Sequence, residues 1–196
     1  SCMLYRRCEQ TPNVPNFYLW GFIPVIPRVI SIWIRNGFFK LNFKNILDAF
    51  RPKLPFGLAQ IGKAFRNEIT PRDFIFRVRE FEQMEIEYFV EEKNWKESFE
   101  HWREQMHRWI KDIGLNSDKV HELEVEGPDL AHYSKRTIDF EYDYPFGRKE
   151  LYGLAYRTDY DLQQHIKHSN EKLEYRDLET NEVTVPHVIE PSLGVD

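Results

Sequence analysis

Cysteine is scarce in this chain, which has two cysteines, Cys2 and Cys8, in 196 residues. A single C-x5-C pair lacks the further ligands of a structural zinc site and the cysteine density of a disulfide scaffold. We therefore expect a reducing, cytoplasmic setting.

A long unbroken apolar run is also missing. Residues 17–34 are mostly apolar, but Pro24, Pro27 and Arg28 interrupt them, and no small-residue cleavage site follows. Because a membrane span or signal segment needs a more continuous run, we expect no membrane association.

An excess of positive charge is absent as well. The net charge of -5 and the isoelectric point near 5.8 argue against a uniformly basic nucleic-acid coat, although a local basic groove is compatible with them. With 41% hydrophobic and 15% aromatic residues, the chain has enough apolar material for one sizeable core. We expect a single domain or a large piece of one.

Acidic residues are nearly absent from the first 38 positions, which hold one acid, Glu9, against four arginines. The other 31 of the 32 acids follow, and such a step in composition marks a boundary. We expect residues 1–38 to be an atypical segment, either non-homologous or a divergent N-terminus. Residues 39–196 have the turn signals and periodicities of an α/β unit.

One amphipathic helix is predicted over residues 91–113. Apolar side chains recur there at steps of three and four, with charged residues between them: Trp95, Phe99, Trp102, Met106, Trp109, Ile110 and Ile113. This spacing is typical of a helix that packs one side against a core, rather than of a ligand site.

A long antiparallel hairpin is predicted from two strand-like stretches, Gly57–Glu68 and Arg77–Val90, around a loop that contains Pro71 and Asp73. Side chains alternate along a strand, so each stretch should present one polar face. On the second strand that face holds Arg77, Arg79, Phe81, Gln83 and Glu85, and the opposite face holds Val78, Met84, Ile86 and Tyr88. On the first strand it holds Gln60, Gly62, Ala64, Arg66 and Glu68, and its two small residues leave room for a flat ligand.

The order Arg77, Phe81, Glu85 along one face suits a nucleotide and an amine. Arginine binds phosphate oxygens, an aromatic ring stacks on a base, and a carboxylate accepts bonds from an amine. The alternative is that these charges form ordinary cross-strand ion pairs on an exposed ribbon.

The stretch FRNEITPRDFIFRVREFEQMEIEYF resembles the second signature motif of class II aminoacyl-tRNA synthetases in its glycyl-tRNA synthetase version. Upstream, NFKNILDAFRPKLPFGLAQIGKAF is similar to the approach to that motif. Later stretches, GPDLAHYSKRTIDFEYDYPFG, KELYGLAYRTDYDLQQH and VIEPSLGVD, resemble further parts of bacterial, dimeric glycyl enzymes. The resemblance covers residues 42–196.

The resemblance implies an α/β (α+β) fold, with an antiparallel sheet flanked by helices. It also implies ATP and Mg2+ as cofactors, activation of glycine as glycyl-adenylate, transfer to tRNA(Gly), and a homodimer in the intact enzyme.

The resemblance assigns catalytic roles to three residues: Arg66 at the α-phosphate, Glu68 at the adenine and Arg77 at the outer phosphates. Phe81 would stack on the base. Further ATP contacts are expected from Asn67, Phe76, Val78, Arg79, Glu80, Glu150, Leu151 and Gly194, and Glu150 is the expected Mg2+ ligand.

Glycine is expected to contact Phe81, Gln83, Glu85, Glu190 and Ser192, whose two acids suit an ammonium group in a desolvated pocket. A tight pocket excludes larger amino acids by steric clash. Asp129, His132 and Tyr133 have no role in the resemblance, and we expect them to be structural.

The chain departs from the family pattern at both ends. SIWIRNGFFKL stands where the family carries an RPETAQG segment, whose acid helps to form the amino-acid pocket. The sequence ends at Asp196, before the third-motif arginine and the anticodon-binding domain, so we expect an incomplete fragment. Two alternatives remain at this point: a catalytically inactive synthetase-like accessory protein that binds nucleotide, and a class II enzyme for another amino acid.

Overall fold

The computed structural model describes residues 29–31 and 38–195, with side chains from residue 43 onward. Its helices are α1 (Phe38–Phe50), α2 (Trp95–Asp112) and α3 (Tyr160–Ser169). Its strands are β1 (Val29–Ser31), β2 (Phe56–Phe65), β3 (Glu80–Val90), β4 (Val120–Val125), β5 (Arg136–Tyr144), β6 (Gly147–Thr158), β7 (Tyr175–Arg176), β8 (Val183–Thr184) and β9 (His187–Gly194).

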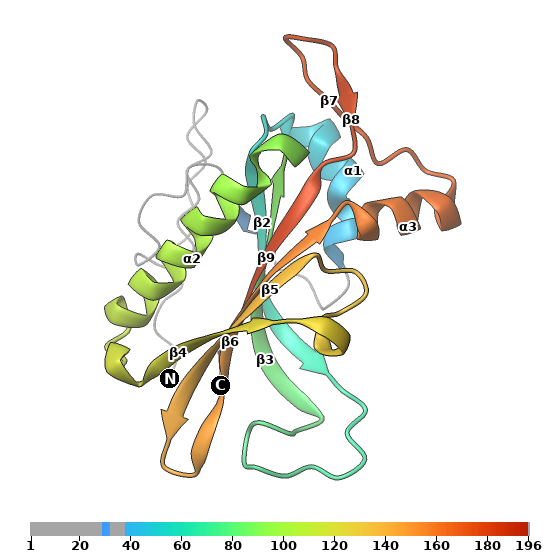
Figure 1. Cartoon of the computed structure of the whole chain (residues 1–196). Helices are drawn as coiled ribbons and strands as arrows, with labels where there is room; N and C mark the ends of the chain where they lie inside the picture. Colours follow the sequence, from blue (N-terminus) through green and yellow to red (C-terminus); the bar gives the residue numbers. More distant parts are fainter. Residues whose placement is uncertain (1–28, 32–37, 196) are drawn as a thin grey trace.

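One sheet organises the described part of the chain. Its strand order is β1-β2-β3-β9-β6-β5-β4, and every neighbouring pair is antiparallel except β1 with β2. In Figure 1 the strands run between α2 on one side and α1 and α3 on the other. The predicted antiparallel sheet flanked by helices is confirmed.

Helix α2 forms the main core with one face of the sheet. Its buried residues Phe99, Trp102, Met106 and Ile110 pack with apolar side chains of several strands, including Tyr88, Met84, Phe140, Leu154 and Ile189. The predicted amphipathic helix is therefore present, because its stripe has a sheet to bury against. Ile113 was predicted to belong to the stripe, but it lies just beyond the helix end and is 41% exposed.

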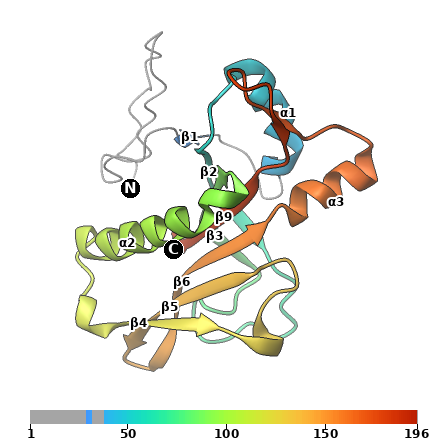
Figure 2. The ribbon, with the colours of Figure 1, turned by 45° about the horizontal axis from the view of Figure 1, so that its top comes forward.

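The opposite face of the sheet is covered at one end only. There α1 and α3 bury a second apolar cluster with the strands: Phe43, Ile46, Phe56, Leu58, Phe89, Leu162, Leu173 and Val188. Figure 2 shows β6 running into α3 beside α1. Beyond this cluster the same face is lined by polar and small side chains, and it holds the candidate site.

The predicted atypical segment 1–38 and the apolar run 17–34 lie almost wholly outside the described residues. Within the part of the chain that the structure describes, none of the helices has the length and apolar character that crossing a membrane requires.

Trp102 tests how far the α2 core stabilises the sheet. Its ring is 3% exposed and packs edge-to-face on Tyr88, with the centroids 5.4 Å apart. We expect Trp102→Ala to lower the free energy of unfolding by about 3–5 kcal/mol, because it leaves a large cavity. Trp102→Phe should lower it less, since Trp102 Nε1 has no hydrogen-bond partner among the described residues.

Urea unfolding of both variants measures this difference. Glu104→Ala, on the exposed side of α2, serves as the control and should change the free energy by less than about 0.5 kcal/mol. Equal losses for Trp102→Ala and Trp102→Phe would contradict the role assigned to ring packing.

Candidate active site

The strand register aligns residues from five strands in one row across the open face. Gln60 on β2 lies opposite Glu85 on β3, and Glu85 lies opposite Ser192 on β9. Ser192 lies opposite Gly153 on β6, which lies opposite Asp139 on β5. Directly opposed residues point to the same face of a sheet, so this row crosses the face that α2 does not cover.

The neighbouring rows add two of the other predicted glycine contacts. Gln83 lies opposite both Gly62 and Gly194, and its Nε2 donates a hydrogen bond of 2.6 Å to Ser192 Oγ. Glu190 lies opposite Ala155 on β6. The predicted residues Gln83, Glu85, Glu190 and Ser192 are therefore brought together by β3 and β9.

The floor between these polar groups is made of small residues. A Cβ atom on Gly194 would have no heavy atom within 4 Å, whereas one on Gly153 would make ordinary contacts of 3.7 and 3.9 Å. Gly62 shares the polar face, as predicted. Ala64 shares it too, opposite Phe81, but it is covered by neighbouring atoms and is only 3% exposed.

Glu190 is held by Arg157, a residue that our sequence analysis missed. Arg157 Nη1 lies 2.7 Å from Glu190 Oε2, and Arg157 Nε lies 2.7 Å from Asp161 Oδ2. The guanidinium also stacks over the Tyr133 ring at 4.1 Å. Burial opposes the charge of Arg157, but Glu190 and Asp161 outweigh it and hold its pKa above the ordinary value. Alternation along β6 places Gly153, Ala155 and Arg157 on one face, and this pattern was a usable sequence signal.

The predicted hairpin is present, but its strands are shorter at the loop end. Strand β2 ends at Phe65 and β3 begins at Glu80. The predicted strand positions Arg66, Asn67, Glu68, Arg77, Val78 and Arg79 consequently lie in the loop 66–79. Strand alternation therefore does not place Arg77 and Arg79 beside Phe81.

Hydrogen bonds within the loop explain this correction. The Arg66 amide donates to the Arg79 carbonyl at 3.0 Å, and Arg79 Nε donates to the Glu68 carbonyl at 2.9 Å. At the far end, Arg72 and Arg77 exchange two backbone hydrogen bonds, while Asp73 and Phe74 turn the chain with positive φ angles of 57° and 55°. Backbone groups are satisfied locally, so the regular ladder stops early.

Several predicted nucleotide residues lie close together in this loop and at its base. Arg77 Nη1 lies 3.8 Å from Glu68 Oε1. The Arg66 guanidinium lies over the Phe81 ring, 5.0 Å from its centroid. Glu80 forms an ion pair with Lys63 across the strands. Phe76 packs its ring on Tyr144 and Phe146, 5.1 and 5.5 Å away between centroids.

A β-bulge directs the neighbouring side chains of Glu150 and Leu151 to different places. Phe140 on β5 pairs with Tyr152 and Glu141 pairs with Glu150, so Leu151 is the extra residue on β6. Leu151 packs against the α2 core, whereas Glu150 is exposed at the site. A bulge commonly redirects a side chain in this way. The predicted contact Glu150 is therefore presented to the open face.

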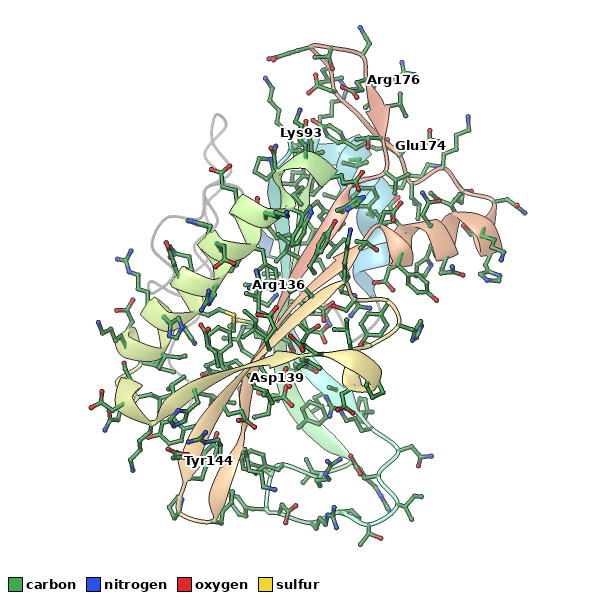
Figure 3. All side chains as sticks on the ribbon, viewed as in Figure 1. Lys93, Arg136, Asp139, Tyr144, Glu174 and Arg176 are labelled. Atoms are coloured by element: carbon green, nitrogen blue, oxygen red, sulfur yellow. The ribbon has the colours of Figure 1, made fainter. Side chains whose placement is uncertain are left out.

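Asp139 is a second acid that our sequence analysis missed. A Cβ atom on Gly153 would lie 3.9 Å from Asp139 Oδ1 and 3.7 Å from Glu150 Oε1, so both carboxylates border the floor. Figure 3 shows Asp139 on β5, partway along the strand. Burial, followed by the charges of Glu150 and Glu141, raises the pKa of Asp139 to about 6. The sequence pattern that could have indicated this position of Asp139 was the alternation of Thr137, Asp139 and Glu141 along β5.

Comparisons with known proteins bear on the family and the fold of the chain. Residues 35–196 match the family model described as the tRNA synthetase class II core domain (G, H, P, S and T). The Giardia lamblia prolyl-tRNA synthetase, solved in complex with prolyl-adenylate, superposes with a TM-score of 0.61 over 81% of this chain and 30% of that one. At 15% sequence identity, this likeness concerns the fold alone.

Curated relatives give a closer similarity in sequence. The glycine–tRNA ligase of Geobacillus thermodenitrificans is 52% identical over 159 residues, and that of Clostridium tetani is 53% identical over 156. The Thermus thermophilus ligase is 52% identical over 174 residues. Each alignment covers 80% of this chain but 34% of the relative, so the chain spans about a third of the length of these proteins.

The raised pKa of Asp139 predicts a stability that falls as pH rises. A carboxyl group with pKa about 6 in the folded chain and 3.8 ordinarily favours folding when protonated, and this advantage is lost between about pH 4 and 6. Discounted for partial exposure, the effect is about 1 kcal/mol. We therefore expect Asp139→Asn to raise the free energy of unfolding by that amount at pH 7.5 and to leave it unchanged at pH 4.

Urea unfolding at the two pH values checks this prediction, with Glu104→Gln as an exposed control acid. A gain of the same size at both pH values would show that the titration of Asp139 is not its cause.

Proposed function

Because this chain belongs to the class II core-domain family of tRNA synthetases, we propose that it carries the ATP and glycine sites of a glycine–tRNA ligase. The observation that carries this proposal is the pairing of β3 with β9, which sets Glu85 opposite Ser192 and brings Glu190 alongside. The glycine–tRNA ligases that resemble the chain at 50–53% identity support it.

The glycine pocket is proposed on the floor between Glu85 and Glu190. Two carboxylates offer a favourable environment for the glycine ammonium, and Ser192 is oriented by its bond from Gln83. Glycine has no side chain, so Ser192 and the Arg157–Glu190 pair beside the floor would reject larger amino acids by contact. The altered segment before residue 39 contributes nothing to this proposal.

The ATP site is proposed above the same floor, at the base of the loop 66–79. Arg66 would bind the α-phosphate and Arg77 the outer phosphates, each through guanidinium N–H groups. Phe81 would stack on adenine, and Glu68 would accept from its amino group. Support comes from the placement of Arg66 over Phe81 and of Glu68 near Arg77. Asn67, Phe76, Val78, Arg79, Glu80, Leu151 and Gly194 stay predicted neighbours of the nucleotide, and Leu151 would contribute its backbone because its side chain packs against the α2 core.

The proposed chemistry needs no protein nucleophile. A carboxylate oxygen of glycine attacks the α-phosphorus of ATP, and the bond from that phosphorus to the bridging oxygen of pyrophosphate breaks. A ribose hydroxyl of the terminal tRNA nucleotide then attacks the glycyl carbonyl carbon, and AMP leaves. The residues of this site contribute by holding the reactants in line and by offsetting charge at the α-phosphate through Arg66.

Magnesium fits the donor set that the chain offers. Among the described residues, no group of three or more His, Cys, Asp or Glu side chains is arranged to hold a metal ion by itself. Mg2+ characteristically takes one or two carboxylates together with phosphate oxygens and water, and Glu150 with Asp139 beside it supplies such carboxylates. When bound, the ion would offset negative charge on the phosphate oxygens.

The finer biological setting is proposed from the sequence resemblance. We propose that the complete enzyme acts on tRNA(Gly) as a homodimer in the cytoplasm.

Binding calorimetry with a non-reactive glycyl-adenylate analogue tests the glycine site. We expect this chain to bind the glycyl analogue at least tenfold more tightly than its alanyl and seryl counterparts, a difference of about 1.4 kcal/mol or more. Glu85→Ala should weaken glycyl binding by a similar factor, because the ammonium loses a charged acceptor. Asp112→Ala, at the end of α2, is the matched control that removes an acid away from the site.

Each result separates two functions. Equal affinity for the three analogues would support a nucleotide site but contradict glycine selectivity. Binding of ATP without formation of labelled adenylate would favour the catalytically inactive, accessory reading of the same fold.

Removal of magnesium tests Glu150. We expect Glu150→Gln to weaken ATP binding about tenfold in the presence of Mg2+, because one charged oxygen ligand is lost. In EDTA the variant and the original chain should bind ATP equally weakly. Calorimetry under both conditions measures this, and a loss that persists undiminished in EDTA would show that Glu150 acts without the metal.

A further inference from the structure

An aromatic cluster joins the loop 66–79 to the far end of the sheet. The Phe76 ring meets Tyr144 at 81° and Phe146 at 74°, which are edge-to-face contacts. Tyr144 and Phe146 are stacked on each other, with centroids 5.2 Å apart and 9° between the planes. Both arrangements are favourable for aromatic rings. In Figure 1 the β2–β3 loop and the β5–β6 turn both lie at the lower end of the sheet.

The cluster is formed by residues far apart in the chain. Tyr144 ends β5, and Phe146 lies in the two-residue turn before β6. Figure 3 shows Tyr144 close to that turn. Phe146 is 57% exposed, and its ring contacts both Tyr144 and Phe76. This exposed ring therefore connects the turn to the loop 66–79.

Few side chains of the loop 66–79 are shielded from solvent. Ile69 and Phe74, for example, are 90% and 86% exposed.

 

The half-buried side chains of this loop are those of Glu68, Phe76 and Val78, while the remainder of residues 66–79 is exposed. A long exposed loop retains many conformations unless a contact holds it. Phe76 supplies such a contact, since the loop connects β2 with β3 whereas the Phe76 ring packs on Tyr144 at the end of β5 and on Phe146 in the β5–β6 turn.

Short connections lead from Phe76 to the proposed nucleotide residues. Arg77 follows it directly and exchanges backbone hydrogen bonds of 3.0 and 3.2 Å with Arg72. The Arg77 side chain lies 3.8 Å from Glu68, whose carbonyl accepts from Arg79. Anchoring the Phe76 ring therefore restricts the returning limb of the loop and, through it, the opposite limb.

We infer that Tyr144 and Phe146 are positioning residues that dock Phe76 and thereby hold Arg77 and Glu68 at the nucleotide site. The inference rests on the proposed function for its ligand, ATP. Its structural part, the docking of the loop on the β5–β6 turn, stands on the ring contacts alone.

Two measurements on Phe146→Ala test the inference separately. Trypsin cleavage after Arg72 and Arg77, followed by mass spectrometry, reports how often the loop opens. We expect cleavage to be about two- to tenfold faster and ATP binding to be weaker by a similar factor, as the loss of an aromatic contact predicts. The melting temperature should stay nearly unchanged, because Phe146 is largely exposed.

Two further variants serve as controls. Phe146→Tyr keeps the ring and should retain slow cleavage and full ATP affinity. Phe50→Ala removes a ring that is 50% exposed at the end of α1, and it should leave both measurements unchanged.

The outcomes decide the two parts of the inference. Cleavage by trypsin at an unchanged rate in Phe146→Ala would overturn the docking. Faster cleavage with unchanged ATP affinity would overturn the positioning role. If the original chain bound no ATP, the proposed function and the positioning role would both fail, and the cleavage rates would still decide the docking.

Discussion

The pairing of β3 with β9 is the contact on which both faces of the sheet depend. It sets Met84 opposite Leu193 on the face that α2 covers, and Glu85 opposite Ser192 on the open face. A shift of one residue would turn carboxylates toward the core and apolar side chains toward the site. The register that buries the core therefore also assembles the site.

Helix α2 stabilises this register from the covered face. Phe99, Trp102 and Met106 pack against strands that are far apart in the sequence, so the core is complete only when β3, β9, β6 and β5 are all in place. Arg136 adds a link at the sheet edge, because it pairs with Glu100 of α2 and Glu124 of β4 while its guanidinium lies 4.5 Å from the Phe99 ring centroid. The open face can then carry small and charged residues that contribute little to the core.

The sequence predicted the features that depend on local periodicity. The stripe of α2 and the alternation through Phe81, Gln83 and Glu85 follow from spacing within one segment, and the resemblance to a known family supplied the fold. The strand ends were wrong, since the loop 66–79 satisfies its own backbone groups. Alternation along β5 and β6 indicates which residues share a face with Asp139 and Arg157. Both were missed because their place at the site also depends on how β5 pairs with β6 and β6 with β9, which spacing within one segment does not reveal.

The carboxylates around Arg157 come from three elements of the fold. Glu190 on β9, Asp161 on α3 and Glu87 on β3 all act to keep Arg157 protonated. Glu85 lies on β3 as well, opposite Ser192 of β9. One guanidinium thus links β9, β3 and α3 at a place where the side chains of Arg157 and Glu190 are about 15% exposed. Charged groups largely removed from water are costly unless they are paired, so Arg157 and these carboxylates stabilise one another's positions. In the proposed glycine site, this pairing would keep the Glu190 carboxylate in place beside Ser192, where the glycine ammonium would bind.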